Sequence, residues 1–190
     1  MLTPSGRNPS LLRADDTLLM VVDMQDPFLS AMWERERLVR NACLLLDAAR
    51  ALRLPVVPTL QNSRRLGGLT SEVAARVPAQ CFPYDKMTFS CVGNDACLSE
   101  IVRSGRRQIL ICGLETHICV HQTAHDLLAR GFQVHVAADA VSSRTQANWE
   151  FGLARMERAG VLISTSEMAI YEVLYEAGTP EFDQILEMVR

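Results

Sequence analysis

The segment from Ile109 to Ala124 constrains the fold of this chain more than any other part of the sequence. Its first residues, Ile109 to Cys112, form a continuous apolar run, which is typical of a strand buried on both faces of a parallel sheet. Gly113 ends the run, and a helical pattern begins near His117. We therefore expect Cys119 in the first turn of a helix, at the carboxyl end of a strand. Ligands bind at that end of open α/β sheets.

Apolar runs and helical patterns alternate along the rest of the chain. We expect strands at 17–22, 55–60, 83–86, 107–112, 133–138 and 161–164. We expect helices at 37–53, 94–104, 117–130, 145–158, 166–175 and 180–189. This alternation predicts an α/β fold, a three-layer α/β/α Rossmann-like architecture with a six-stranded, mainly parallel sheet.

The domain organisation predicted from this pattern is simple. Residues 1–14 are expected to form an N-terminal arm, and residues 15–190 a single domain. The connection from Gln61 to Cys81 is long and contains Gly67, Gly68 and Pro78. Long loops in compact domains are often functional, so we expect it to border the pocket or a subunit contact.

Charge and cysteine usage exclude several classes of partner. The net charge is -3, and no basic cluster is longer than two residues, so neither nucleic acid nor a membrane surface is indicated. No apolar run has the length of a transmembrane helix. The six cysteines form no C-x-x-C pair, which is typical of reduced thiols in a cytoplasmic protein. We expect the partner to be a small-molecule substrate.

Three residues have the chemistry of an activated nucleophile. Asp23 ends the apolar run from Leu18 to Val22, and Lys86 lies in a short run after Pro83. A carboxylate that takes a thiol proton, a lysine that holds charge and Cys119 at a helix start would form such a set. The helix dipole and Lys86 would favour the thiolate.

Each of these residues also has a structural interpretation that the spacing leaves open. Asp23 could cap the following helix, since Asp is a favoured N-cap. Lys86 could be an ordinary solvated lysine, and Cys119 a small buried hydrophobe.

Several stretches of the chain match a known family. They are Val21 to Phe28, Lys86, Cys112 to Ala124, Gly131 to Arg144 and Ser164 to Glu167. With these motifs in order over about residues 15–175, the chain resembles the isochorismatase-like cysteine hydrolases. It is most similar to the isochorismatase-domain-containing hydrolases of unassigned substrate.

The resemblance implies roles for individual residues. It implies a catalytic triad of Asp23, Lys86 and Cys119, and a cis peptide between Leu114 and Glu115. The backbone N–H groups of Glu115 and Cys119 would then form an oxyanion hole. A non-proline cis bond costs roughly 3–4 kcal/mol, so it persists only where its surroundings enforce it.

The substrate pocket and the assembly are also inferred partly from the resemblance. It implies that Phe28 lines the pocket, although a core aromatic is an equally good interpretation. Gln61, at the carboxyl end of a strand, and Leu114 are expected to contact the substrate. Members of the family are usually homo-oligomers, so we expect a homo-oligomer here.

The function expected from these features is hydrolysis of a small amide (C–N) or related acyl bond through a Cys119 thioester. One alternative is a non-catalytic interaction protein, because fold alone does not fix function. Another is a hydrolase that cleaves a vinyl ether, as isochorismatase itself does. The cysteine favours the thioester route.

We expect neither a cofactor nor a metal. No GxGxxG and no Walker A motif is present. His117, His121 and His125 share one helix face, but no carboxylate joins them in a known metal-binding spacing. Relatives with nicotinamidase activity carry metal-binding histidines around the second strand, where this chain has Pro58 to Ser63 without a histidine. That departure disfavours nicotinamidase activity.

Overall fold

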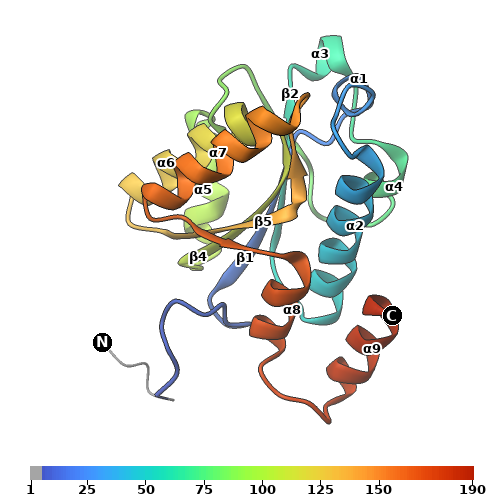
Figure 1. The fold of residues 1–190 in the computed structure, drawn as a ribbon, viewed down its shortest axis with the longest axis vertical. Helices are drawn as coiled ribbons and strands as arrows, with labels where there is room; N and C mark the ends of the chain where they lie inside the picture. Colours follow the sequence, from blue (N-terminus) through green and yellow to red (C-terminus); the bar gives the residue numbers. More distant parts are fainter. Residues whose placement is uncertain (1–5) are drawn as a thin grey trace.

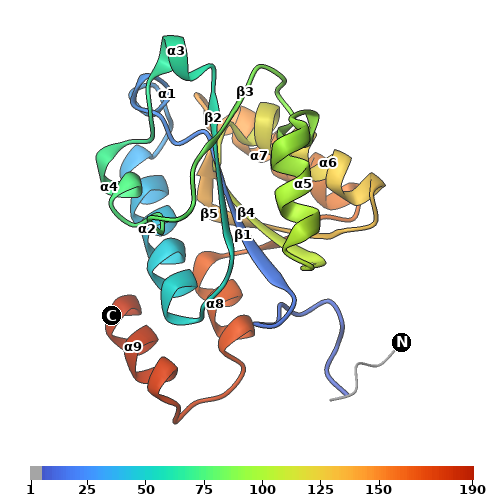
Figure 2. The same ribbon diagram turned by 180° about the vertical axis from the view of Figure 1, so that it is seen from behind.

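A six-stranded sheet forms the centre of the molecule. The computed structural model describes residues 6–190. The strand order is β3-β2-β1-β4-β5-β6, and every neighbouring pair is parallel (Figures 1 and 2). The strands are β1 Thr17–Val22, β2 Val56–Gln61, β3 Tyr84–Lys86, β4 Gln108–Leu114, β5 Gln133–Ser142 and β6 Leu162–Ser164. The predicted α/β fold is confirmed, and the sheet is parallel throughout.

Helices cover both faces of the sheet. One layer consists of α2 Arg35–Ala51, α8 Ser166–Leu174 and α9 Pro180–Val189. The opposite layer consists of α5 Asp95–Arg103, α6 His121–Ala129 and α7 Gln146–Arg158. Shorter elements lie in the connections: α1 Asp26–Leu29, α3 Ser63–Leu66, α4 Ser71–Ala74, the 3₁₀ turn η1 Cys91–Gly93 and the π-helical turn η2 Thr116–Val120. The six predicted long helices are all present: five have ends within two residues of the predicted ones, whereas the helix predicted at 117–130 begins as the π-helical turn η2 and continues as α6 from His121.

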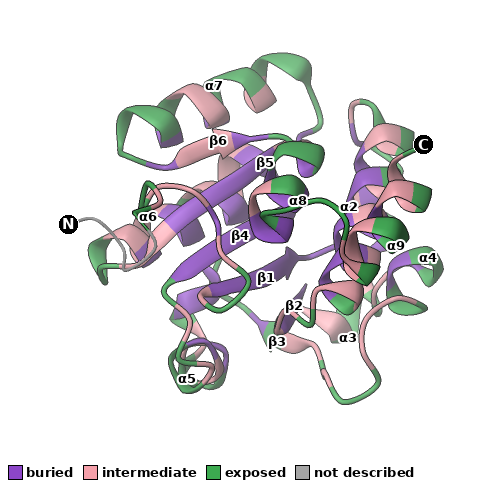
Figure 3. Ribbon diagram, turned by 90° about the horizontal axis from the view of Figure 1, so that it is seen from below, coloured by how far each residue is buried: buried purple, intermediate pink, exposed green. Residues whose placement is uncertain are grey.

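The central strands are apolar on both faces because both faces are covered. Leu19 and Val21 of β1 pack in the core beneath α2, whereas Leu18, Met20 and Val22 pack in the core beneath α5 and α6. All five side chains are almost fully buried (Figure 3). Burying one such side chain contributes about 1.5–3 kcal/mol, so a sheet covered on both sides favours a continuous apolar run over an alternating one.

A close contact between β1 and β4 positions the carboxyl ends of these two strands. Val22 is paired with Gly113 in the sheet register. Gly113 has a φ of 115°, and a Cβ at this position would lie 2.0 Å from the Val22 carbonyl oxygen. Only glycine fits there. The contact brings Asp23, which follows β1, beside the segment that follows β4.

The N-terminal segment contacts the domain from residue 7 onward, and the predicted residues 1–5 of the arm lie outside the described part of the chain. Leu12 is fully buried in the core beneath α2 and α8. Its backbone N–H donates to the Glu172 carboxylate at 2.9 Å, and that of Arg13 donates to Gln108 at 2.8 Å. Among residues 6–190, no helix is long and apolar enough to cross a membrane.

Candidate active site

Asp23 lies directly after β1, buried and in an uncommon backbone conformation. Its φ is 52°, in the left-handed region that few non-glycine residues adopt. Thr59 Oγ1 donates to Asp23 Oδ1 at 2.8 Å, and Lys86 Nζ donates to Oδ2 at 2.6 Å. The N-cap of α1 is Gln25, so Asp23 does not cap that helix. The carboxylate is held by specific donors at the end of the strand.

Lys86 ends β3 and is not a solvated surface lysine. It is 3% exposed, and its ammonium group donates to Asp23 Oδ2 and Gln61 Oε1, each at 2.6 Å. Burial lowers the pKa of Lys86, but its interactions with Cys91, Asp23 and Cys119, in which the two thiols act only when ionised, outweigh burial and raise that pKa above its ordinary value. Lys86 is also the only lysine in the sequence, a signal that could have singled it out without any motif.

Cys119 lies in the π-helical turn after β4 and is 7% exposed. Burial, followed by the negative charge of Asp23, raises the pKa of its thiol to about 12, although Lys86 lowers it. The expected preference for the thiolate is therefore wrong. The cost of burying the charged thiolate exceeds the stabilisation that Lys86 and the start of the helix give to it. A thiol whose pKa is raised in this way is neutral near pH 7.

The backbone before Cys119 differs from the expected one. Every peptide bond in the described residues is trans, so the predicted cis bond between Leu114 and Glu115 is wrong. Glu115 is extended, and its carbonyl accepts from the N–H groups of Ile118 at 3.0 Å and Val120 at 3.2 Å. These bonds close the turn with an ordinary trans peptide, which is roughly 3–4 kcal/mol more favourable than the cis form. The cis geometry that would have turned the Glu115 N–H into the pocket is absent from the described chain.

The side chain of Glu115 has a role that the sequence did not indicate. It is 8% exposed, and its Oε2 accepts from the backbone N–H and from Nε of Arg144, both at 3.1 Å. Arg144 follows β5 in the matched Ser-Ser-Arg segment. The Glu115–Arg144 pair therefore links the turn that carries Cys119 to the end of β5.

A small cavity of about 60 Å³ adjoins these groups. The residues that line it are Asp23, Phe28, Gln61, Phe89, Leu114, Glu115, Ile118 and Cys119. The three residues expected to contact the substrate, Phe28, Gln61 and Leu114, all lie in its wall. Phe89 and Ile118 were not predicted, because neither has a pattern in the sequence that indicates which way its side chain faces.

Gln61 forms hydrogen bonds within the site itself. It accepts from Lys86 and donates through Nε2 to the Met87 carbonyl at 3.1 Å. Its backbone N–H donates to Gln25 Oε1 at 2.8 Å, and Gln25 Nε2 donates to the Gly67 carbonyl at 2.8 Å. Gln61, the last residue of β2, lines the cavity, whereas residues 62–81 of the long connection do not, and a role of that connection in a subunit contact stays a prediction.

The histidine stripe lies outside this cavity. His117 Nδ1 is 2.9 Å from Ser143 Oγ, and the rings of His121 and His125 have centroids 4.3 Å apart. Within residues 6–190, no three His, Cys, Asp or Glu side chains are arranged to hold a metal ion.

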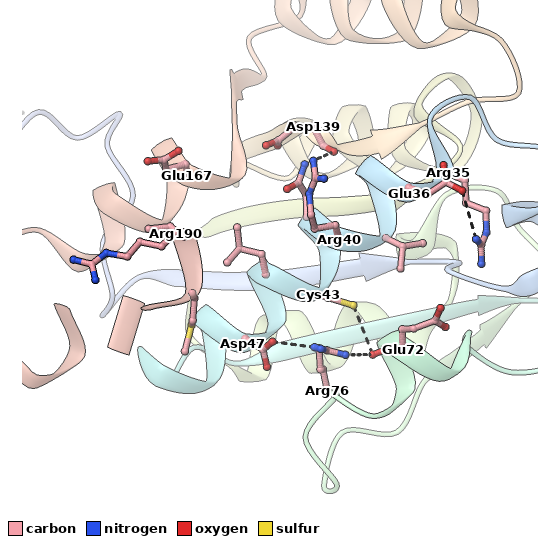
Figure 4. Close-up of a pocket in the computed structure, with 15 residues that line it drawn as sticks. Arg35, Glu36, Arg40, Cys43, Asp47, Glu72, Arg76, Asp139, Glu167 and Arg190 are labelled. Atoms are coloured by element: carbon pink, nitrogen blue, oxygen red, sulfur yellow. Dashed lines mark hydrogen bonds and ion pairs between the residues drawn. The ribbon is translucent and has the colours of Figure 1, made fainter. Parts of the chain in front are cut away.

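A much larger groove, of about 760 Å³, lies along α2 and the carboxyl end of α9 (Figure 4). It also contains a cysteine, Cys43, whose Sγ is 3.6 Å from the Glu72 carbonyl oxygen. Its Asp47 carboxylate is paired with Arg76 at 2.9 Å. Burial raises the pKa of Cys43 as well. Charged side chains of both signs line the groove. Cys43 has no buried carboxylate–lysine pair beside it of the kind found at Cys119.

The fold is a three-layer α/β fold, and its acid, ammonium and thiol groups lie at the carboxyl end of the parallel sheet, where ligands bind in such folds. The isochorismatase domain model matches residues 17–168, so the chain belongs to the isochorismatase family. The family predicted from the motifs is confirmed, and the chain has the fold of an isochorismatase-family hydrolase.

Relatives and solved structures agree with this assignment. Isochorismatase domain-containing protein 2 of Bos taurus is 38% identical over 175 residues, which cover 92% of this chain and 83% of the relative. The structure of MAR1 ribonuclease from Caenorhabditis elegans has a TM-score of 0.88 at 30% identity, covering 94% of this chain and 92% of that one. YcaC from Escherichia coli, described as an octameric hydrolase of unknown specificity, has a TM-score of 0.88 at 22% identity and covers 96% and 92%.

Proposed function

We propose that this chain is a cysteine hydrolase that cleaves a small amide (C–N) or related acyl bond through a thioester on Cys119. One observation carries the proposal. Cys119 shares a cavity with Asp23, and the Asp23 carboxylate is paired with Lys86 at 2.6 Å with both side chains 1% exposed. Removing two charges from water costs several kcal/mol per ion, so such a pair is poor evidence of a stability device. A catalytic role accounts for it.

The reaction follows from the neutral state of the thiol. As the Cys119 sulfur attacks the substrate carbonyl carbon, Asp23 takes the S–H proton. The C–N bond then breaks, the proton passes from Asp23 to the leaving amine, and the acyl group stays on sulfur as a thioester. A water molecule attacks the thioester and gives its proton to Asp23, which returns it to the sulfur as the acid leaves. Lys86 stabilises the Asp23 carboxylate while that group is charged.

The oxyanion of the tetrahedral intermediate needs a donor. The backbone N–H of Cys119, in the turn η2 that follows β4, is the donor that this mechanism assigns to it. A preorganised donor of this kind is worth about 2.7–4 kcal/mol.

Two other functions are less well supported. An interaction protein has no need of a buried Asp–Lys pair beside a thiol. A vinyl ether hydrolase has no need of the sulfur, which lies in the cavity wall. RNA is a sensible control substrate, because the C. elegans relative is named a ribonuclease.

We also propose that the chain acts in the cytoplasm as a homo-oligomer. Its cysteines are all free among the described residues, which fits a reducing compartment. Phe82, Met87 and Phe151 are each more than 70% exposed, and these apolar side chains are the surface that subunit contacts would cover. Light scattering at micromolar concentration tests the assembly, and a mass of a single chain contradicts it.

Substitution of the two charged residues tests the mechanism. In a screen of small amides, esters and RNA, we expect Asp23→Asn and Lys86→Ala each to lower turnover by at least about 100-fold, the scale of a lost general base. Asp95→Asn, at an exposed position at the start of α5, is the matched control and should keep full activity. Circular dichroism checks that each variant is folded. Near-normal turnover by a folded Asp23→Asn variant removes Asp23 from the mechanism.

A further inference from the structure

We infer that the substrate carries a short, uncharged, apolar acyl group, and that Phe89 sets its maximum length. This inference rests on the proposed hydrolysis at Cys119. The acyl group is the part of the substrate that remains on the sulfur between the two half-reactions, so it must occupy the cavity while the amine leaves.

The wall of the cavity is apolar. Four of the eight residues that line it, Phe28, Phe89, Leu114 and Ile118, have apolar side chains. Leu114 belongs to β4 and is 1% exposed, so that side is fixed by the sheet.

The polar side chains that reach the cavity are already engaged by protein partners. Asp23 accepts from Thr59 and Lys86. Gln61 accepts from Lys86 and donates to the Met87 carbonyl. Glu115 accepts twice from Arg144 and adds a negative charge beside the cavity.

A carboxylate on the acyl group would therefore be buried among apolar side chains and close to two carboxylates. Burying an unpaired charge costs several kcal/mol, and like charges add to this cost. Acids such as the monoamides of dicarboxylic acids should therefore be rejected.

The volume of the cavity limits the size of the acyl group. One water molecule needs about 10–15 Å³ of cavity volume. Counting one non-hydrogen atom for each such volume, the cavity of about 60 Å³ holds roughly four to six non-hydrogen atoms.

Phe89 closes the exposed side of the cavity. It is 53% exposed and belongs to the segment between β3 and η1, where Thr88 Oγ1 donates to the Ser90 carbonyl at 2.9 Å. This hydrogen bond closes a local turn around Phe89, whose ring is not part of the buried core. Truncating this ring opens the cavity without removing a core contact.

The experiment measures kcat/KM for ammonia release from linear primary amides, acetamide to decanamide. It adds 4-methylpentanamide and its charged counterpart of equal shape, succinamate. We expect an optimum at three to five carbons, which with the carbonyl oxygen makes roughly the four to six non-hydrogen atoms of the volume limit above. Succinamate should be at least about 100-fold slower, as burial of its charge requires. Phe89→Ala should move the optimum to longer acyl chains. Phe82→Ala is the matched control, because Phe82 is 78% exposed and absent from the cavity wall, and should not move it.

The outcomes separate this inference from the function on which it rests. Hydrolysis that depends on Cys119 but prefers succinamate, or an optimum that Phe89→Ala leaves in place, overturns the inference and keeps the function. Equal hydrolysis by Cys119→Ala, or no hydrolysis of any amide in the series, overturns both.

Discussion

At the scale of single residues, the site is a chain of hydrogen bonds that begins at Thr59 and runs through Asp23, Lys86 and Gln61 to the Met87 carbonyl. Gln61 was expected to bind substrate. Both ends of its side-chain amide are bonded within the protein, so it also holds the Lys86 ammonium toward Asp23. These two roles make different kinetic predictions.

We expect Gln61→Leu to lower kcat by about 10- to 100-fold with little change in KM. A hydrogen bond to a charged group contributes about 1.5–3 kcal/mol, and its loss would leave Lys86 poorly placed. Gln146→Leu is the matched control, because Gln146 is exposed, its side chain donates to Glu150 at 2.8 Å, and it is absent from the cavity wall. If KM rises and kcat is retained, Gln61 is a substrate contact and does not position Lys86.

At the scale of helices and strands, sequence patterns predicted most of the architecture. The runs at residues 18–22 in β1 and 109–112 in β4 are apolar throughout because each strand is covered on two faces. The short helices α3 and α4 were not predicted, because four residues are too few to show a helical period.

The candidate site could be predicted only in part. Spacing placed Asp23, Lys86 and Cys119 at strand ends, but the resemblance supplied their grouping. The direction of Phe89, the state of the Cys119 thiol and the trans peptide before Glu115 depend on packing in three dimensions. A sequence pattern carries no direct record of that packing.

Adding one methyl group at Gly113 tests the close contact between β1 and β4. We expect Gly113→Ala to lower the free energy of unfolding by about 4 kcal/mol or more, or to prevent folding, because its Cβ would lie 2.0 Å from the Val22 carbonyl oxygen at a positive φ. Gly68→Ala is the matched control, since a Cβ there has no heavy atom within 4 Å. Urea unfolding measures both. Equal stability of the two variants means that the strands can separate without cost at this point.

At the scale of the whole molecule, one buried titratable group links stability to pH. His135 on β5 is 2% exposed, and its Nε2 is buried without a hydrogen-bond partner within the described residues. Burial lowers the pKa of His135 to about 4 from an ordinary 6.5. The unfolded chain therefore takes up a proton at a pH where the folded chain does not.

The sign of the effect follows from that difference. The free energy of unfolding keeps its full value above about pH 6.5, where His135 is neutral in both the folded and the unfolded chain. As the pH falls towards 4, protonation of His135 in the unfolded chain lowers this free energy by up to about 3 kcal/mol. Urea unfolding at pH 7, 5.5 and 4.5 measures the loss. His135→Leu places an apolar side chain at this buried position, and we expect its free energy of unfolding to fall less over this pH range. An unchanged pH dependence would assign the acid sensitivity to other groups.

The central claim is that Cys119 becomes acylated and that Asp23 removes its proton. The most direct measurement is single-turnover intact mass of the acid-quenched protein, with the modified peptide mapped by fragmentation, using a p-nitrophenyl ester of butyric acid as the acyl donor. We predict one butyryl group on Cys119 in the native chain and in Cys81→Ala, where the altered cysteine lies outside the cavity. Asp23→Asn should form the adduct at least about 100-fold more slowly. An adduct on another residue, or equal acylation of Asp23→Asn, would contradict the account.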